Sequence, residues 1–133
     1  MANIESRLVL AAGAMASTNT LYSAPMDIAR MTMASFQAQW SGTPNGTITI
    51  WVSNQFNPKR DMHGAELAAA VVASFAANEW IAAVVTGGSN PAGSASQEGW
   101  DLSPALPFRW VILRYVNASS TGTLNVWFHG KDR

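Results

Sequence analysis

Hydrophobic and polar residues alternate with a period of two along much of this chain, as they do in a strand that buries one face. Residues 28–40 alternate in this way, and residues 47–53 do so even more regularly. Turn-forming residues at positions 41–46 separate the two segments, so the pattern predicts an antiparallel hairpin. The apolar residues predicted to share a face are Ala34, Phe36, Ala38 and Trp40 on the first strand, and Ile48, Ile50 and Val52 on the second.

The same alternation recurs near the C-terminus. Residues 108–116 and 123–129 each alternate, and the segment 117–122 between them is rich in Ser, Thr, Asn and Gly. The pattern predicts a second hairpin, whose last strand ends at Gly130. On this last strand the two faces are Leu124, Val126 and Phe128 against Asn125, Trp127 and His129.

Shorter segments complete the β pattern. Residues 7–12 predict a strand, and the small residues of segment 13–24 form either an edge strand with a loop or an arm that lies on a neighbouring molecule. Residues 80–86 are an apolar run rich in Ile and Val, which predicts another strand. Residues 87–99 predict a long loop that is either mobile or used in contacts.

Residues 54–78 differ from the rest of the chain. Segment 54–64 is polar and contains Pro58, Lys59, Arg60, Asp61 and His63, which predicts an exposed loop. The Ala-rich segment 65–77 predicts a helix of about three turns. A strand remains open there, because Val71 and Val72 favour β structure. The helical interpretation places Leu67, Val71, Ser74 and Phe75 on one face.

Together these segments predict a mainly β protein, an antiparallel β-sandwich with a jelly roll as the leading architecture. A chain of 133 residues fits one domain. We expect an N-terminal strand and arm over residues 1–24, and a sandwich over 25–133 that carries an insertion at 55–78.

Charge is sparse in this sequence. Only 12% of residues are charged, and eight Lys and Arg balance eight Asp and Glu. Nucleic-acid binding and membrane-surface binding both require a basic patch, so we expect neither. A neutral chain that is 48% hydrophobic tends to self-associate, which predicts that other subunits cover part of its surface.

The N-terminus lacks the basic-then-apolar organisation of a secretory signal, and no stretch approaches the ~20 apolar residues of a membrane-spanning helix. Cysteine is absent, so the sequence has no disulfide framework, thiolate nucleophile or Cys-based zinc site.

Residues suited to catalysis are few. Asp61 and His63 are spaced for metal binding, but a closed site needs about four ligands, and a solvated loop explains them better. Glu98 and Asp101 offer a carboxylate pair for Ca²⁺ or a sugar, although an exposed loop needs no such explanation. His129 takes no role. We therefore predict a protein that is not an enzyme and has no cofactor.

Six tryptophans are the conspicuous feature of the composition. Trp51 and Trp127 lie opposite the aliphatic faces of their strands. If that second face is exposed, the rings form a platform for sugars or for a subunit interface. If other parts of the chain cover it, the rings are core residues.

Three segments carry a resemblance. Residues 106–115 read LPFRWVILRY, residues 119–126 read SSTGTLNV, and residues 46–54 read GTITIWVSN. The first two resemble the C-terminal hairpin of small structural proteins of tailed bacteriophages, and the third resembles an inner strand of the same proteins. The resemblance implies a virion protein with a jelly-roll-like fold.

Within that class the resemblance implies a capsid decoration or cement protein. It would be made in the host bacterial cytoplasm and lie on the capsid surface, where it would bind the major capsid protein and itself, as a homotrimer. The alternative is a carbohydrate-binding or receptor-binding module of a tail fibre or tail tip, which requires at least two coplanar exposed rings and a glycan ligand. The residues predicted to form the interface are Leu21, Tyr22, Trp51, Phe56, Asn57, Lys59, Arg60 and Trp127.

Overall fold

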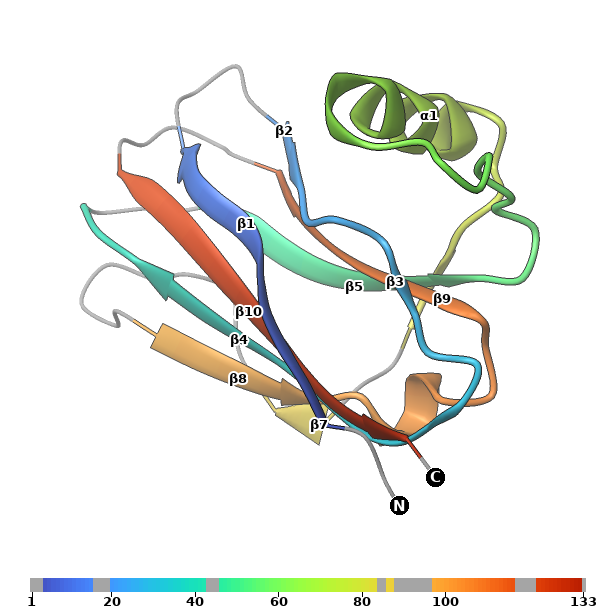
Figure 1. The fold of residues 1–133 in the computed structure, drawn as a ribbon. Helices are drawn as coiled ribbons and strands as arrows, with labels where there is room; N and C mark the ends of the chain where they lie inside the picture. The colour runs from blue at the N-terminus through green and yellow to red at the C-terminus, as the bar shows by residue number, and fades with distance from the viewer. Residues whose placement is uncertain are drawn as a thin grey trace.

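The computed structural model describes residues 4–15, 20–42, 46–83, 86–87, 97–116 and 122–132. These residues form two antiparallel β-sheets packed face to face, with an α-helix on the outside of one of them (Figure 1). The predicted mainly β sandwich is confirmed.

Sheet A has the strand order β1-β10-β4-β8-β7, and sheet B has the order β2-β9-β5-β6, with β3 also pairing with β9. The strands of sheet A are β1 (Ile4–Ala14), β4 (Met31–Trp40), β7 (Thr86–Gly87), β8 (Gln97–Asp101) and β10 (Thr123–Asp132). Those of sheet B are β2 (Thr20–Tyr22), β3 (Met26–Asp27), β5 (Thr47–Ser53), β6 (Ile81–Ala82) and β9 (Trp110–Val116). The helices are α1 (Gly64–Ala76) and the short 3₁₀ helix η1 (Ser103–Ala105).

The strand pairings are nested in the order of the chain. β1 pairs with β10, β2 with β9, β4 with β8, and β5 with β6. Nested antiparallel pairs describe one long ribbon, and the pairings of β4 with β10 and of β5 with β9 show that this ribbon is rolled over into two sheets. This is the topology of a jelly roll, which confirms the leading architecture.

Both predicted hairpins are wrong. β4 lies in sheet A and β5 in sheet B, and the same is true of β10 and β9. Alternation records which face of a strand is buried, and that face is the same whichever sheet supplies the neighbouring strand. A short connection can turn the chain within a sheet or cross the ~10 Å between packed sheets, and here it crosses. Of the turns predicted at 41–46 and 117–122, residues 43–45 and 117–121 lie outside the described residues.

Other segments also differ from expectation. The strand predicted over 80–86 is two short strands in different sheets: β6 pairs with β5, and β7 pairs with β8. The loop predicted over 87–99 gives way to β8 at Gln97, and its residues 88–96 lie outside the described residues. At the N-terminus, β1 pairs with β10 from Ile4 to Ala14, so the strand predicted over 7–12 is present and is longer than expected. Farther along, β2 pairs with β9 in sheet B, and an arm that lies on a neighbouring molecule stays a prediction.

The main core lies between the two sheets. Alternate residues of the strands contribute much of it, and Tyr115, Phe36 and Phe128 are its largest fully buried side chains. Phe36 and Phe128 are also cross-strand partners on β4 and β10, with their ring centroids 5.8 Å apart in an edge-on arrangement. The shared faces predicted for the segments 28–40, 47–53 and 123–129 are therefore confirmed, since Ala34, Phe36, Ala38, Trp40, Ile48, Ile50, Val52, Leu124, Val126 and Phe128 are all buried.

The segment predicted as helix or strand is helix α1, which covers the outer face of sheet B (Figure 1). Its Ala-rich sequence favours a helix. It ends because Asn78 adopts a left-handed conformation at φ 58°. The Asn78 N–H then donates to the Phe75 carbonyl at 3.1 Å, and the Glu79 N–H donates to the Ser74 carbonyl at 3.0 Å, the double closure of a Schellman motif.

Candidate functional site

The outer face of sheet A is the broad face of the sandwich that α1 does not cover. Its register places Leu8 of β1 beside Trp127 of β10, and Trp127 beside Gln37 of β4. Lys131 has Ile4 on one side and Met33 on the other. These four apolar side chains, Ile4, Leu8, Met33 and Trp127, are all exposed, with Ile4 and Met33 more than 60% accessible.

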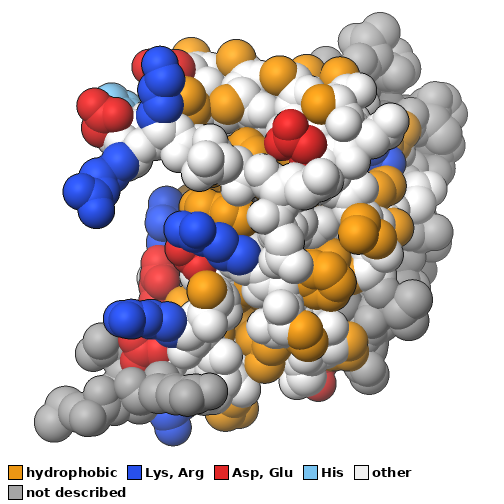
Figure 2. Space-filling model, turned by 90° about the vertical axis from the view of Figure 1, so that its right-hand side faces the viewer, with side chains coloured by type: hydrophobic (Ala, Val, Ile, Leu, Met, Phe, Trp, Pro, Cys, Tyr) orange, Lys and Arg blue, Asp and Glu red, His pale blue; other side chains and the backbone are white. Residues whose placement is uncertain are grey.

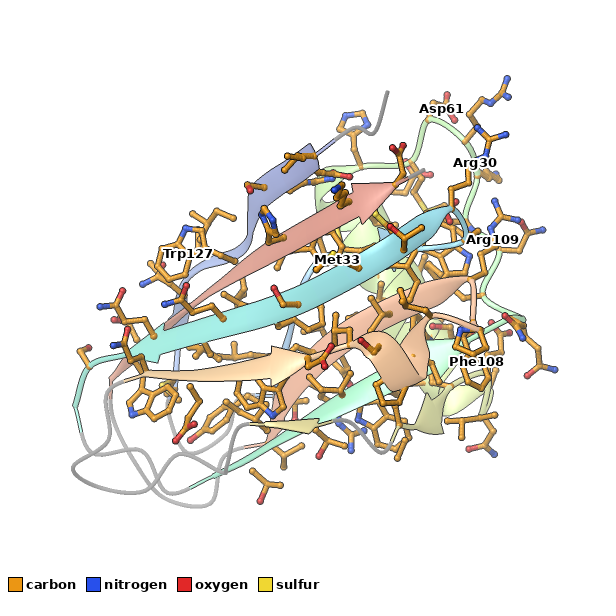
Figure 3. All side chains as sticks on the ribbon, turned by 90° about the horizontal axis from the view of Figure 1, so that it is seen from below. Arg30, Met33, Asp61, Phe108, Arg109 and Trp127 are labelled. Carbon is orange, nitrogen blue, oxygen red and sulfur yellow. The ribbon has the colours of Figure 1, made fainter. Side chains whose placement is uncertain are left out.

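Most other residues of this face are small and neutral. Ser6 and His129 are cross-strand partners, and the Ser6 hydroxyl lies 2.7 Å from Nδ1 of His129 in a hydrogen bond. The polar, uncharged side chains of the face include Ser35, Gln37, Gln39, Gln97 and Asn125. Trp127 and Met33 can be followed on this sheet in Figure 3. The outer face of sheet A is thus a flat surface of amides and hydroxyls in which exposed apolar residues are embedded.

A groove of about 740 Å³ runs between β4 and β8 on this sheet. Gly99 faces Gln37 across the two strands, and a Cβ at Gly99 would meet nothing closer than the Phe36 carbonyl at 3.7 Å, so the backbone lies open there. Asp101 of β8 and His129 of β10 also line the groove, and each is a cross-strand partner of Ser35 on β4. The groove therefore offers amide, carboxylate and imidazole groups along an open stretch of strand.

Asp101 is held in its charged form. Its Oδ1 accepts the Ser103 hydroxyl at 2.7 Å and the Ser103 backbone N–H at 3.0 Å. Because both bonds favour the carboxylate, they lower the pKa of Asp101 from its ordinary value of 3.8. Glu98 is the Cα partner of the buried Ala38, whereas Asp101 is the partner of Ser35 on the outer face, so these two carboxylates do not share a face of β8.

The outer face of sheet B is closed by α1. The Trp51 ring meets Phe75 edge-on with their centroids 5.4 Å apart, and Phe75 stacks on Trp80 at 5.2 Å with an interplanar angle of 3°. Tyr22 lies 5.0 Å from Phe75, and Phe56 lies 5.3 Å from Trp80. These rings form a second hydrophobic core between sheet B and the helix.

This core decides where several predicted interface residues lie. Phe56 is buried in it, and Tyr22 and Trp51 are half-buried against it. Trp51 and Trp127 lie on different sheets, so they do not form one platform. Leu21 is half-buried against the main core, whereas Asn57, Lys59 and Arg60 are exposed on the loop before α1.

Four residues of the exposed surfaces were not predicted from the sequence. Ile4, Leu8 and Met33 carry the apolar exposure on sheet A, and Arg109 lines a cleft with Lys59 and Arg60. A usable signal existed for Met33, because it alternates against the buried Ala34 and Phe36. For Leu8 the signal was weak, since β1 contains two register shifts that disturb its alternation.

The other candidate ligands stay apart. His63 Nδ1 lies 2.9 Å from the Asp61 carbonyl oxygen in a hydrogen bond, and both residues are exposed. Among the described residues no three His, Asp or Glu side chains gather closely enough to hold a metal ion. Within the same residues, no helix has the length and apolar character needed to span a membrane.

The fold and the surfaces define a jelly-roll sandwich with one helix-covered face and one open face. No protein-family model matches the sequence, and no curated protein does so. Among solved structures, the chain is similar to the SPBc2 prophage-derived protein YomS, with a TM-score of 0.53 and 12% identity, covering 99% of this chain and 96% of that one. This likeness extends over the whole sandwich and supports the fold.

A structure of Tomato Aspermy Virus also aligns, over 100% of this chain and 77% of that one, at 8% identity. Its TM-score of 0.26 is too low to support any argument.

Proposed function

We propose that this chain is a structural protein of a bacteriophage or prophage particle, and that it acts by binding other protein subunits. The outer face of sheet A carries this proposal. It exposes Trp127, Leu8 and Met33 on a rigid sheet with few charges. The likeness in fold to a prophage-derived protein supports the phage part of this proposal.

The composition of this face suits a protein interface. The centres of protein interfaces are depleted in charged residues and enriched in Trp and Met. Here Trp127 lies between Leu8 and Gln37, and the nearest polar neighbours are amides and hydroxyls that can bond to another polar surface without a large desolvation cost. A sheet face of this kind meets a flat partner without rearranging, because strand pairing fixes its backbone.

Within this class we propose a capsid decoration or cement role. The protein would form a homotrimer and bind the major capsid protein, adding buried area between capsid subunits. It would stabilise the assembled shell by mass action, since it would bind the shell and not the free, unfolded subunits. No step of this role needs a cofactor or an active site.

Glycan binding is the second candidate, and the groove along β8 is the observation that favours it. Gln37, Gln97 and Asp101 line that groove, and such groups hydrogen-bond sugar hydroxyls. Stacking is the weaker part of this candidate. Trp127 is exposed, whereas the other five tryptophans are buried or half-buried, so the pair of coplanar exposed rings is not formed by tryptophans.

The deciding experiment measures solution mass and shell binding. Light scattering over a range of concentrations should give three times the 14.2 kDa of one chain. Capsids assembled without the protein should then bind it in a sedimentation assay and resist heat better. A monomer that ignores capsids but binds on a glycan array would replace the decoration role with the second candidate.

A further inference from the structure

Half of the chain's cations gather at one end of the sandwich. Of the eight Lys and Arg residues, Lys59, Arg60 and Arg109 line a cleft of about 510 Å³, and Arg30 lines an adjoining cleft that also contains Arg109. Arg30 and Arg109 project at the same end in Figure 3, and Figure 2 shows Lys and Arg side chains above and below a hollow at the left of that view. In a chain with so few charges, this grouping forms the main cationic surface of the described residues.

The cleft is both cationic and apolar. Its described lining contains no carboxylate, and its apolar part includes Pro58, Leu67 and Trp110. The Arg109 guanidinium lies 5.5 Å from the centre of the Trp110 ring. The indole N–H of Trp110 is buried and has no hydrogen-bond partner among the described residues.

The loop that forms one wall is held in place. The side-chain oxygen of Asn54 accepts the Arg109 backbone N–H at 2.9 Å, which ties the start of the loop to the start of β9. The Ser53 hydroxyl oxygen accepts the N–H groups of Gln55 and Phe56, at 3.0 and 2.9 Å. Phe56 is buried and meets Trp110 edge-on at 5.4 Å. Binding to a wall already ordered in this way loses little conformational entropy.

We propose that this cleft binds an acidic peptide segment of a partner protein, through a Glu or Asp carboxylate with an apolar neighbour. The planar guanidinium of Arg109 matches a carboxylate, and the apolar part of the cleft accepts the adjoining side chain. Asp27 is the present partner of Arg109, at 3.5 Å, but both groups are about half exposed, so this ion pair is weak and exchangeable.

The local charges argue against a polyanion. Asp27, Asp61 and Asp132 lie around the cationic residues. An extended phosphate backbone would therefore meet these carboxylates as well as the cations. A single carboxylate can enter the cleft without contacting them. The inference that the peptide belongs to another particle subunit rests on the proposed function. The inference that the cleft binds an acidic peptide is independent of that function.

The test uses the full chain and a short synthetic peptide of alternating Glu and Leu residues, with a peptide of Gln and Leu as the matched probe. In ¹H–¹⁵N NMR titrations, the Glu peptide should shift the indole N–H signal of Trp110, assigned with a Trp110→Phe variant. The Gln peptide should shift it far less. Added salt should weaken the binding, because exposed charges are screened.

Three variants test whether the Glu peptide binds in the cleft or is attracted by the overall charge of the protein. Lys59→Gln with Arg60→Gln, and separately Arg109→Gln, should each weaken the Glu peptide about tenfold, as expected for losing a charge-assisted hydrogen bond. Lys131→Gln, which removes one cation from the outer face of sheet A, should leave the affinity unchanged. Thermal melts of the loop variants should match the wild type, because those side chains are exposed.

Three results would overturn the proposal. They are a Glu peptide that does not bind at all, a Lys131→Gln variant that loses as much affinity for it as the cleft variants do, and a peptide that shifts only the indole signals of other tryptophans. Inorganic phosphate or an oligothymidylate that binds this cleft more tightly than the Glu peptide would also overturn it. The proposed function rests on the outer face of sheet A. If the cleft does not bind the peptide, the expected trimer mass and shell binding are therefore unaffected, and the failure of either proposal can be recognised separately.

Discussion

The guanidinium of Arg114 lies 4.4 Å from the centre of the Trp51 ring and 5.3 Å from that of Phe75. Arg114 and Trp51 come from β9 and β5 of sheet B, and Phe75 comes from α1. The charge is therefore held between the sheet and the helix by aromatic faces, and its Nε has no hydrogen-bond partner among the described residues. Trp51, which the sequence offers as an interface ring, is used inside the chain.

Replacing Arg114 tests this contact. An Arg114→Met variant keeps the apolar stem but removes the cation, and we expect the free energy of unfolding to fall by about 1–2 kcal/mol in urea melts. Arg114→Lys keeps the charge but not the planar group, so its free energy of unfolding should lie between those of the wild type and of Arg114→Met. A methionine variant as stable as the wild type would mean that the aromatic contacts only offset the burial of the charge.

The hydroxyl of Ser74 links the helix to the following segment. It donates to the Val71 carbonyl at 2.6 Å and accepts the indole N–H of the buried Trp80 at 2.7 Å. Ser74→Ala leaves that N–H without a partner and should reduce the free energy of unfolding by about 1–3 kcal/mol. Ser6→Ala, on the exposed face, should change it by no more than about 0.5 kcal/mol.

A double-mutant cycle checks the assignment. In a Trp80→Phe background the indole donor is already absent, so adding Ser74→Ala should have a smaller effect than it has alone. Equal effects in both backgrounds would show that Ser74 acts through its bond to Val71.

The pKa of Asp101 should respond to Ser103. The Ser103 hydroxyl contributes most to lowering the pKa of Asp101, so Ser103→Ala should raise it toward 3.8. Because the pKa is lower in the folded protein, Asp101 adds stability at pH values above 3.8, and this contribution is lost as the pH falls through the folded pKa. Carboxyl ¹³C NMR titration measures the shift, and a pKa unchanged in the variant would contradict the hydrogen-bond explanation.

Leu8 and Trp127 should control self-association. Their exposed side chains are neighbours on sheet A, so Leu8→Ser with Trp127→Ser should convert the expected trimer to a monomer in light scattering. Ile81→Ser is the matched control, since Ile81 is also an exposed apolar residue but belongs to β6 of sheet B. A trimer that survives the double change would move the interface away from sheet A.

The sequence by itself determined the main elements and their buried faces. Alternation is a local property, so the inward residues of β4, β5, β9 and β10 were predictable, as were the helix at α1 and a sandwich of the jelly-roll kind. It did not reveal which strands are neighbours, since pairing depends on chain connections that cross between sheets. Both predicted hairpins failed for this reason.

Only the tertiary structure decided which of the two outer faces stays open. Trp51 and Trp127 occupy equivalent places in the sequence pattern, each opposite an aliphatic face. Helix α1 packs on sheet B and covers Trp51, whereas the described residues leave sheet A uncovered and Trp127 exposed. The cleft of Lys59, Arg60 and Arg109 likewise joins residues far apart in the chain. Contacts of this kind arise when separate elements pack together, and no local pattern encodes them.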